Sequence, residues 1–276
     1  PVIHGLTNGK RWLANTGRQE SKQAIFVPTD AQFGVEGRPQ SGTGQAAILT
    51  GLNVPQMIGR HYGPKPDAET REIIREHSYF KRVVERGKRA ALLDAYPPGL
   101  HREINRGKTL RSSIQQAAHE SGQALFTVDD LVAKRAVTAE WTTDAWQRYL
   151  KITDLPEYSA FEAGQLLAQI SRNYDFAFHS HWFTDRVGHK GPFSQGVELL
   201  EMFDQVMAGI LSEWKDDEGL IIVTSDHGNM EDVSDRHHTE NKVPTLIVGS
   251  QKSEFAEGYT ALTDLVPRFD KFLFGT

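Results

Sequence analysis

Segments with a helical period alternate with short apolar runs along most of the chain. A helix-like pattern is followed by a strand-like run in 69–96, again in 159–183, and a third time in 194–225. Parallel strands need such crossovers, so this alternation is typical of α/β proteins. We therefore predict one domain over residues 1–276, an α/β fold with a mostly parallel central sheet and helices on both faces.

The stretch 97–154 is less regular than the rest of the chain. It contains several basic residues together with Trp141 and Trp146. It either forms a small cap within the domain, which would supply charged or aromatic contacts to a substrate, or runs over the protein surface without such a role.

An acid and an imidazole follow one of the predicted strands. The runs 219–225 and 243–249 are short, β-branched and flanked by turn residues, as buried strands are. Asp226 and His227 come directly after the first run. Ligands of open α/β sheets bind beyond the carboxyl ends of strands, so we expect this pair to face a site. The alternative is a solvated polar turn.

A second acid and imidazole, Asp185 and His189, lie four residues apart after the strand-like run 175–183. On a helical turn or a tight loop this spacing points both side chains the same way, as two ligands of one ion require. Oxygen beside nitrogen suits zinc or manganese. The alternative is an ordinary surface contact between helix neighbours.

Ser41 lies where a predicted helix begins. Small residues open the segment 38–55, and Gly51 and Pro55 are typical of its end. Amide groups at a helix start favour an anion, and Gly42 and Gly44 would let a tetrahedral oxyanion group approach the chain closely. A bound cation would activate the serine hydroxyl as a nucleophile. Without one, Ser41 would simply be an N-cap.

Together these segments resemble the alkaline phosphatase superfamily, and within it the cofactor-independent phosphoglycerate mutases and their shorter metalloenzyme relatives. The resemblance runs from about Asp30 to the C-terminus, and the motifs follow the family's order. The matching motifs are the nucleophile segment Ser41–Gly51, the pair Asp185 and His189, the run Asp226–Asn229 ("DHGN"), and His238 before the strand that Pro244 opens.

The resemblance implies an alkaline-phosphatase-like core with two divalent cations, zinc or manganese. Asp185, His189 and His238 would hold one cation, and Asp226, His227 and the oxygen of Ser41 the other. His237 is the alternative to His238. The pair His179 and His181 would share one face of a strand, where both residues either line the site or are ordinary strand residues.

The sequence departs from the family in one respect. The family begins with a strand that ends in Asp-Gly, and that aspartate is a further ligand of the cation that activates the nucleophile. Here the first apolar run ends at Asp30, eleven residues before Ser41, too short a distance for a strand, a crossover helix and a return. We therefore expect that strand to lie upstream of the given sequence, and its place beside the strand before Asp226 to be unfilled or substituted. Asp30 is the alternative ligand.

Composition limits the possible partners. The 276 residues carry a net charge of −5 and include no cysteine, which argues against a nucleic-acid partner and excludes disulfides and thiolate metal sites. No apolar run is long enough to span a membrane, and no signal peptide is visible, so a cytoplasmic location without membrane contact is expected. The oligomeric state is open.

We predict a metal-dependent phosphoryl-transfer enzyme, and specifically a hydrolase of small phosphate esters, monoesters or diesters, with Ser41 as nucleophile. Only 143 residues separate Ser41 from Asp185, which leaves no room for the long inserted domain of the mutases. The alternatives are a phosphomutase of the phosphoglycerate mutase type and a metal-binding protein that has lost catalysis.

Overall fold

The computed structural model describes residues 1–13, 15–215 and 219–276. The strands are β1 Gln19–Glu20, β2 Ala24–Thr29, β3 Ala90–Leu92, β4 Phe176–Phe178, β5 Ile221–Val223 and β6 Val243–Val248. The helices are α1 Val2–Leu6, α2 Ser41–Thr50, α3 Val54–Ile58, α4 Ala68–His77, α5 Tyr79–Glu85, α6 Pro98–Asn105, α7 Ser113–Glu120, α8 Val128–Val132, α9 Asp144–Leu150, α10 Ala160–Ser171, α11 Phe183–Lys190, α12 Phe193–Glu213, α13 Lys252–Ala256, the 3-10 turn η1 Leu262–Asp264 and α14 Leu265–Phe274.

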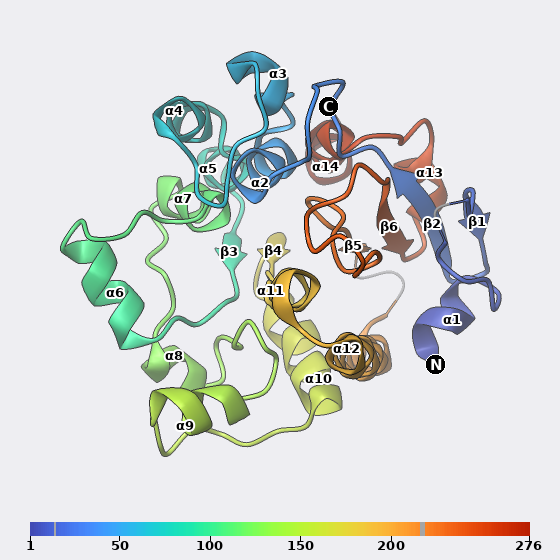
Figure 1. The fold of residues 1–276 in the computed structure, drawn as a ribbon. Coiled ribbons are helices and arrows are strands. Elements are labelled where there is room, and N and C mark those ends of the chain that lie inside the picture. The colour runs from blue at the N-terminus through green and yellow to red at the C-terminus, as the bar shows by residue number, and fades with distance from the viewer. Residues whose placement is uncertain (14, 216–218) are drawn as a thin grey trace.

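The strands form two small sheets instead of one mostly parallel sheet. Four strands in the order β1-β2-β6-β5 pair antiparallel throughout, and β3 and β4 form a separate parallel pair (Figure 1). The prediction of helix and strand alternation was right, but the prediction of a mostly parallel sheet was wrong.

The connections explain the strand directions. The segment between β3 and β4 contains helices α6 to α10, and such a crossover returns the chain in the same direction. The segment 224–242 between β5 and β6 contains no helix, so the chain reverses and the two strands pair antiparallel. Hydrophobic periodicity predicts whether a segment is a helix or a strand, but not whether a strand pairs parallel or antiparallel with its neighbour.

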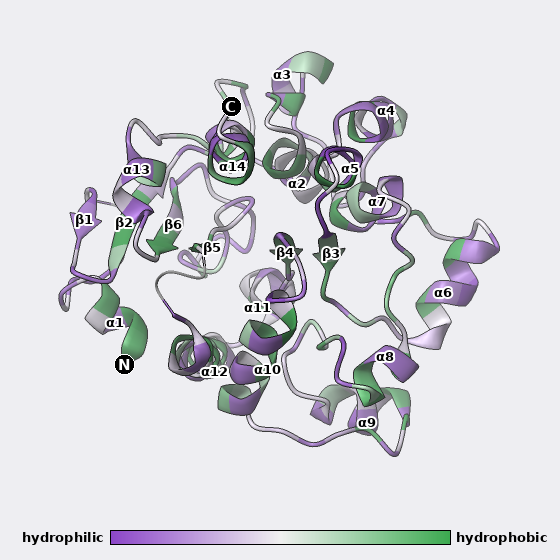
Figure 2. Cartoon of the chain, turned by 180° about the vertical axis from the view of Figure 1, so that it is seen from behind, coloured by the Kyte–Doolittle hydropathy of each residue, from purple (hydrophilic) through white to green (hydrophobic). Residues whose placement is uncertain are grey.

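Helices cover both faces of the four-stranded sheet, as predicted. On one face β2 and β6 share a core with α2, α13 and α14, and on the other they pack against α1 and α12. Most residues of α2 are buried, whereas α4 buries only Thr70 and Ile74, and Figure 2 shows this contrast in hydropathy. Helix α2, with Ser41 as its first residue, is thus fixed firmly in the core.

Two observations bear on the expected first strand. Within the described residues β5 pairs with β6 alone, so its other side is a sheet edge. Strand β2 ends at Thr29, and the carboxylate of the following Asp30 accepts the backbone N–H groups of Gln32 and Phe33 at 3.3 and 3.0 Å. Asp30 therefore caps a local turn.

The irregular stretch 97–154 folds into four short helices. Helix α7 joins the main core through Ile114, Ala117 and Ala118. Helices α8 and α9 instead enclose a small cluster of their own, which includes Leu131 and Trp146. Among the described residues, no helix is both long and apolar enough to cross a lipid bilayer.

Candidate metal centre

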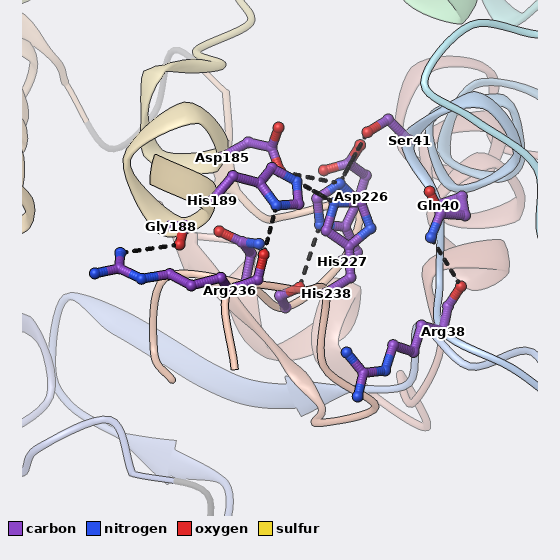
Figure 3. Close-up of polar contacts among 12 residues, drawn as sticks. Arg38, Gln40, Ser41, Asp185, Gly188, His189, Asp226, His227, Arg236 and His238 are labelled. Atoms are coloured by element: carbon purple, nitrogen blue, oxygen red, sulfur yellow. Dashed lines mark hydrogen bonds and ion pairs between the residues drawn. The ribbon is translucent and has the colours of Figure 1, made fainter. Parts of the chain in front are cut away.

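Three of the predicted ligands meet between α11 and the loop before β6. Asp185 and His189 lie one turn apart on α11, and His238 comes from that loop (Figure 3). The Nε2 atoms of the two histidines are 3.1 Å apart, and Oδ1 of Asp185 lies 3.1 Å from His238 Nε2 and 3.3 Å from His189 Nε2. One ligand atom from each side chain therefore faces a common point.

Backbone carbonyls fix the orientation of both imidazoles. Nδ1 of His189 lies 2.8 Å from the carbonyl oxygen of Arg236, and Nδ1 of His238 lies 2.6 Å from that of Pro39. A carbonyl only accepts, so each Nδ1–H donates and each neutral ring turns an Nε2 lone pair toward the other. Two lone pairs and a carboxylate at this distance repel unless positive charge lies between them. The donor set fits a divalent cation such as zinc.

The pKa shifts of the residues in the centre also indicate that positive charge is favoured there. Without a cation, a proton on His238 Nε2 supplies the positive charge: burial alone would raise the pKa of Asp185, but the hydrogen bond from the protonated His238 and the charge of the neighbouring imidazoles lower it below its usual value. Burial would lower the pKa of His238, but its contacts with Asp185 raise it. The site thus favours a negative carboxylate and positive charge beside it.

The second group of predicted residues lies directly beside the first. Ser41 Oγ is 2.9 Å from Nε2 of His227, and the His227 ring stacks on His238 with ring centroids 3.6 Å apart. Asp226 Oδ2 is 3.7 Å from His227 Nε2 and accepts a hydrogen bond from Gln45 at 3.1 Å. The structure therefore gathers all six predicted site residues around one point (Figure 3).

Ser41 does not act as an N-cap. Helix α2 begins at Ser41, and the N-cap position is Gln40, whose side chain makes no capping bond. The Ser41 hydroxyl instead contacts His227. The structure therefore removes the simple alternative explanation of this serine.

Two glycines let the three elements of the site approach one another. A Cβ on Gly44 in α2 would lie 2.7 Å from the carbonyl oxygen of Asp226. A Cβ on Gly188 in α11 would lie 1.3 Å from Oδ1 of Asn229, a buried residue of the loop after β5. Only glycine at these positions allows helix and loop to lie so close.

The other predicted histidines lie elsewhere. His237 is exposed, and its Nδ1 contacts Asp235 at 2.8 Å. Strand β4 ends at Phe178, so His179 and His181 lie beyond it and not on a strand face. His181 stacks on Trp141 with ring centroids 3.9 Å apart, and burial lowers its pKa to about 4.

Sequence reasoning missed a buried polar cluster at the carboxyl ends of β3 and β4. Asp94 is fully buried, accepts the hydroxyl of Ser180 at 2.8 Å, and lies 2.6 Å from Nδ1 of His179. Both ring nitrogens of His179 are buried, and neither has a hydrogen-bond partner among the described residues. Asp94 follows an apolar run, as Asp226 does, and that signal could have identified it.

Comparisons with known proteins agree with this geometry over part of the chain. Residues 155–270 match the family model described as "Metalloenzyme superfamily". The match contains Asp185, His189, Asp226, His227 and His238, while Ser41 lies outside it. The predicted resemblance to alkaline phosphatase-like metalloenzymes is thereby confirmed for this part of the chain.

Curated relatives that match include phosphoglycerate mutases. The 2,3-bisphosphoglycerate-independent phosphoglycerate mutase of Methylobacillus flagellatus is 35% identical over 121 residues, which are 41% of this chain and 23% of that protein. That of Aliivibrio fischeri is 36% identical over 121 residues, 41% of this chain and 24% of that protein. The chain thus matches about a quarter of the length of these relatives.

A solved structure, that of the PH0037 protein from Pyrococcus horikoshii, aligns over 70% of this chain and 51% of that one, with 19% identity and a TM-score of 0.45. A likeness at this score has no bearing on the function of the chain.

Proposed function

We propose that this chain transfers phosphoryl groups from small phosphate esters, with Ser41 as the group that accepts the phosphoryl. One observation carries the proposal. The Ser41 hydroxyl lies 2.9 Å from His227, within the same site as the cluster of Asp185, His189 and His238. A nucleophile at a helix start beside a cluster of metal ligands is an arrangement suited to phosphoryl transfer.

The residues form two sets of candidate ligands. Asp185, His189 and His238 would hold one divalent cation, and Asp226, His227 and the Ser41 oxygen would hold a second. When bound, zinc or manganese would lower the pKa of the serine hydroxyl and neutralise charge on the phosphate oxygens.

The chain's own groups position the reaction. The carbonyl of Gly228 lies 3.3 Å from Nδ1 of His227, which favours the proton on Nδ1 and leaves the Nε2 lone pair facing Ser41 Oγ, where it accepts the hydroxyl without a cation and would bind the cation when one is present. This contact orients Oγ. The amides of Ser41 and Gly42 at the start of α2 would bind the phosphate oxygens, because those of Thr43 and Gly44 already donate to the backbone carbonyls of Tyr62 and Gln40. Attack by Oγ forms the serine–phosphorus bond as the bond to the leaving oxygen breaks.

Two fates of the phosphoryl group define two candidate activities. Transfer to water would make the protein a phosphate ester hydrolase. Return to a different hydroxyl of the same molecule would make it a phosphomutase. The relatives named above are mutases, and this favours the second activity, whereas the short separation of Ser41 from Asp185 favours the first.

Turnover of 4-nitrophenyl phosphate tests the proposal. The protein is freed of metal by chelation and reloaded with zinc or manganese, and we expect turnover only after reloading and none in the Ser41→Ala variant. A second substrate with a free hydroxyl, 3-phosphoglycerate, separates the two activities: phosphate release without isomerised ester would support the hydrolase, and isomerised ester without phosphate release the mutase. Metal binding with no turnover of any ester would show that the chain is a metal-binding protein without this activity.

A further inference from the structure

The second set of candidate ligands is smaller than the first once the serine is set apart. The first set has three permanent ligands, whereas Asp226 and His227 give the second cation only two. The oxygen of Ser41 does not count as permanent, because it is the atom that bonds phosphorus in the proposed reaction. Cations that act in catalysis are ordinarily held by three protein ligands beside one open position. A third permanent ligand of the second cation must come from a side chain close to this pair.

Gln45 lies beside the pair. It follows Ser41 by one turn of α2, so both side chains lie on the same face of that helix. Oγ of Ser41 is 2.9 Å from Nε2 of His227 (Figure 3). One turn on, Nε2 of Gln45 is 3.1 Å from Oδ2 of Asp226. One face of α2 thus contacts both members of the pair.

A single oxygen of Asp226 faces both of its neighbours. Oδ2 accepts the hydrogen bond from Gln45, and it is also the oxygen that lies 3.7 Å from Nε2 of His227. A cation held by Asp226 and His227 would bind this oxygen, beside the hydrogens on Nε2 of Gln45. These hydrogens carry partial positive charge, and an amide NH2 group is only a donor. The amide as it stands therefore stabilises the bare carboxylate and would repel a cation.

The amide of Gln45 can turn over at little cost. Oε1 is buried and has no hydrogen-bond partner within the described residues. A half turn about the last side-chain bond exchanges Oε1 and Nε2, which are of nearly equal size, so the amide fills the same space afterwards. The turn breaks only the hydrogen bond to Asp226, because Oε1 has none to lose. It brings a carbonyl lone pair to the place beside Oδ2 that the N–H group now occupies.

We propose that Gln45 is a ligand of the second cation through its carbonyl oxygen, and that its amide turns over when the cation binds. The inference rests on the two-cation site of the proposed function and adds one ligand to it. Asp226, His227 and Gln45 then hold the second cation permanently, and the fourth position is left to the oxygen of Ser41. Carboxylate and carbonyl oxygens suit manganese, which is therefore the probe used in the experiments.

A crystal structure of the manganese-loaded protein tests the ligand directly. The protein is freed of metal by chelation and reloaded, and anomalous scattering locates the ions. We expect Oε1 of Gln45 at roughly 2.0–2.4 Å from the ion beside Asp226, the usual distance of an oxygen ligand. An ion at Asp226 with the Gln45 amide still at hydrogen-bond distance from Oδ2 and out of contact with the ion would overturn the proposal. So would the absence of an ion beside Asp226.

Affinity measurements separate a ligand from a residue that only orients Asp226. Gln45→Met keeps the length of the side chain without its oxygen, whereas Gln45→Glu keeps an oxygen and loses the N–H group that donates to Asp226. Free manganese is followed by its EPR signal as it is added to the metal-free protein. We expect Gln45→Met to weaken one of two binding steps by about 10-fold or more, and Gln45→Glu to strengthen the same step by about 10-fold or more.

Gln40→Glu is the matched control for the added charge. Gln40 is the N-cap residue of α2, and its side chain bonds to the carbonyl of Arg38 at 3.4 Å instead of contacting Asp226. A nearby charge that is not a ligand should change either binding step by less than about 5-fold. Manganese binding by Gln45→Glu no tighter than that by Gln40→Glu, or unchanged binding by Gln45→Met, would overturn the proposal.

This proposal and the proposed function fail in different ways. Turnover of 4-nitrophenyl phosphate by a loaded protein in which Gln45 contacts no ion would overturn the ligand assignment and leave phosphoryl transfer intact. Two bound ions, one of them on Gln45, without turnover of any ester would overturn phosphoryl transfer and leave the ligand assignment intact.

Discussion

The hydroxyl of Ser41 lies 2.9 Å from Nε2 of His227, a residue 186 positions later in the chain. The first residue of α2 and the fourth residue after β5 thus meet at one point. A serine at a helix start ordinarily caps that helix, and this one does not. Its hydroxyl is therefore available for chemistry.

Replacement of Ser41 by alanine should separate chemistry from stability. We expect turnover to be lost. The free energy of unfolding should fall by no more than about 1 kcal/mol, because the substitution removes one partly buried hydrogen bond and does not remove a helix cap. In a chain of this size such a loss lowers Tm by roughly 2–4 °C. Rate and Tm are measured on the same preparation. Normal turnover in the folded variant would remove Ser41 from the mechanism.

Replacement of His189 by alanine should remove one cation. Its Nε2 lies within 3.3 Å of two other candidate ligand atoms, so its loss leaves two ligands for that ion. Metal content per chain, measured by elemental analysis after dialysis, should fall by one. His237→Ala is the matched control, because this neighbouring histidine is exposed and bonds to Asp235. Equal metal content in both variants would contradict the ligand assignment.

The local pattern of the sequence was enough to predict that Asp185 and His189 lie together as candidate metal ligands. Asp185 and His189 are one helical turn apart, and any helix over these residues puts both on one face. His238 was identified through its distance from the strand that Pro244 opens, and the structure places it, and not His237, against the other two. Short-range spacing places Asp185 beside His189, whereas His238 meets them through a contact between distant segments and was identified through the resemblance.

Contacts between distant segments could not be predicted in this way. Helices α10 and α12 pack through Gly164 and Gly209, where a Cβ would lie 2.0 Å from the carbonyl oxygen of Val206 and 1.9 Å from that of Phe161. Nothing in either helix pattern indicates which glycine meets which backbone. The strand directions, and the contact between Asp94 and His179, depend on distant segments in the same way.

Replacement of Gly44 by alanine should disturb both the fold and the site. The added Cβ would lie 2.7 Å from the backbone oxygen of Asp226, an atom that cannot move aside without shifting the loop. We expect a loss of about 1–3 kcal/mol in the free energy of unfolding, as for other overpacked positions, together with weaker metal binding. In the control Gly17→Ala the new Cβ meets no atom within 4 Å. Similar stability of the two variants would show that α2 and the loop are not held at this distance.

The carboxylate of Asp67 should make stability depend on pH. Asp67 is the N-cap of α4, where it accepts the N–H of Thr70 at 2.9 Å, and it also pairs with Arg60. Burial alone would raise the pKa of Asp67, but the hydrogen bonds from Thr70 and Arg60 lower it below its ordinary value of 3.8. A carboxyl with a lowered pKa in the folded state stabilises the fold above its unfolded pKa, and this contribution is lost as the pH falls through the folded pKa.

The Asp67→Asn variant isolates this charge, because asparagine caps a helix about as well as aspartate. We expect the variant to be less stable than the natural chain at pH 7, and the difference to shrink as the pH falls below 3.8 toward the folded pKa. Urea unfolding at several pH values between 7 and 3 measures it. Asp232→Asn is the control for an exposed carboxylate whose pKa is also lowered but whose hydrogen bonds go only to Ser234. A constant difference between Asp67→Asn and the natural chain over this range would show that the Asp67 charge does not stabilise the fold.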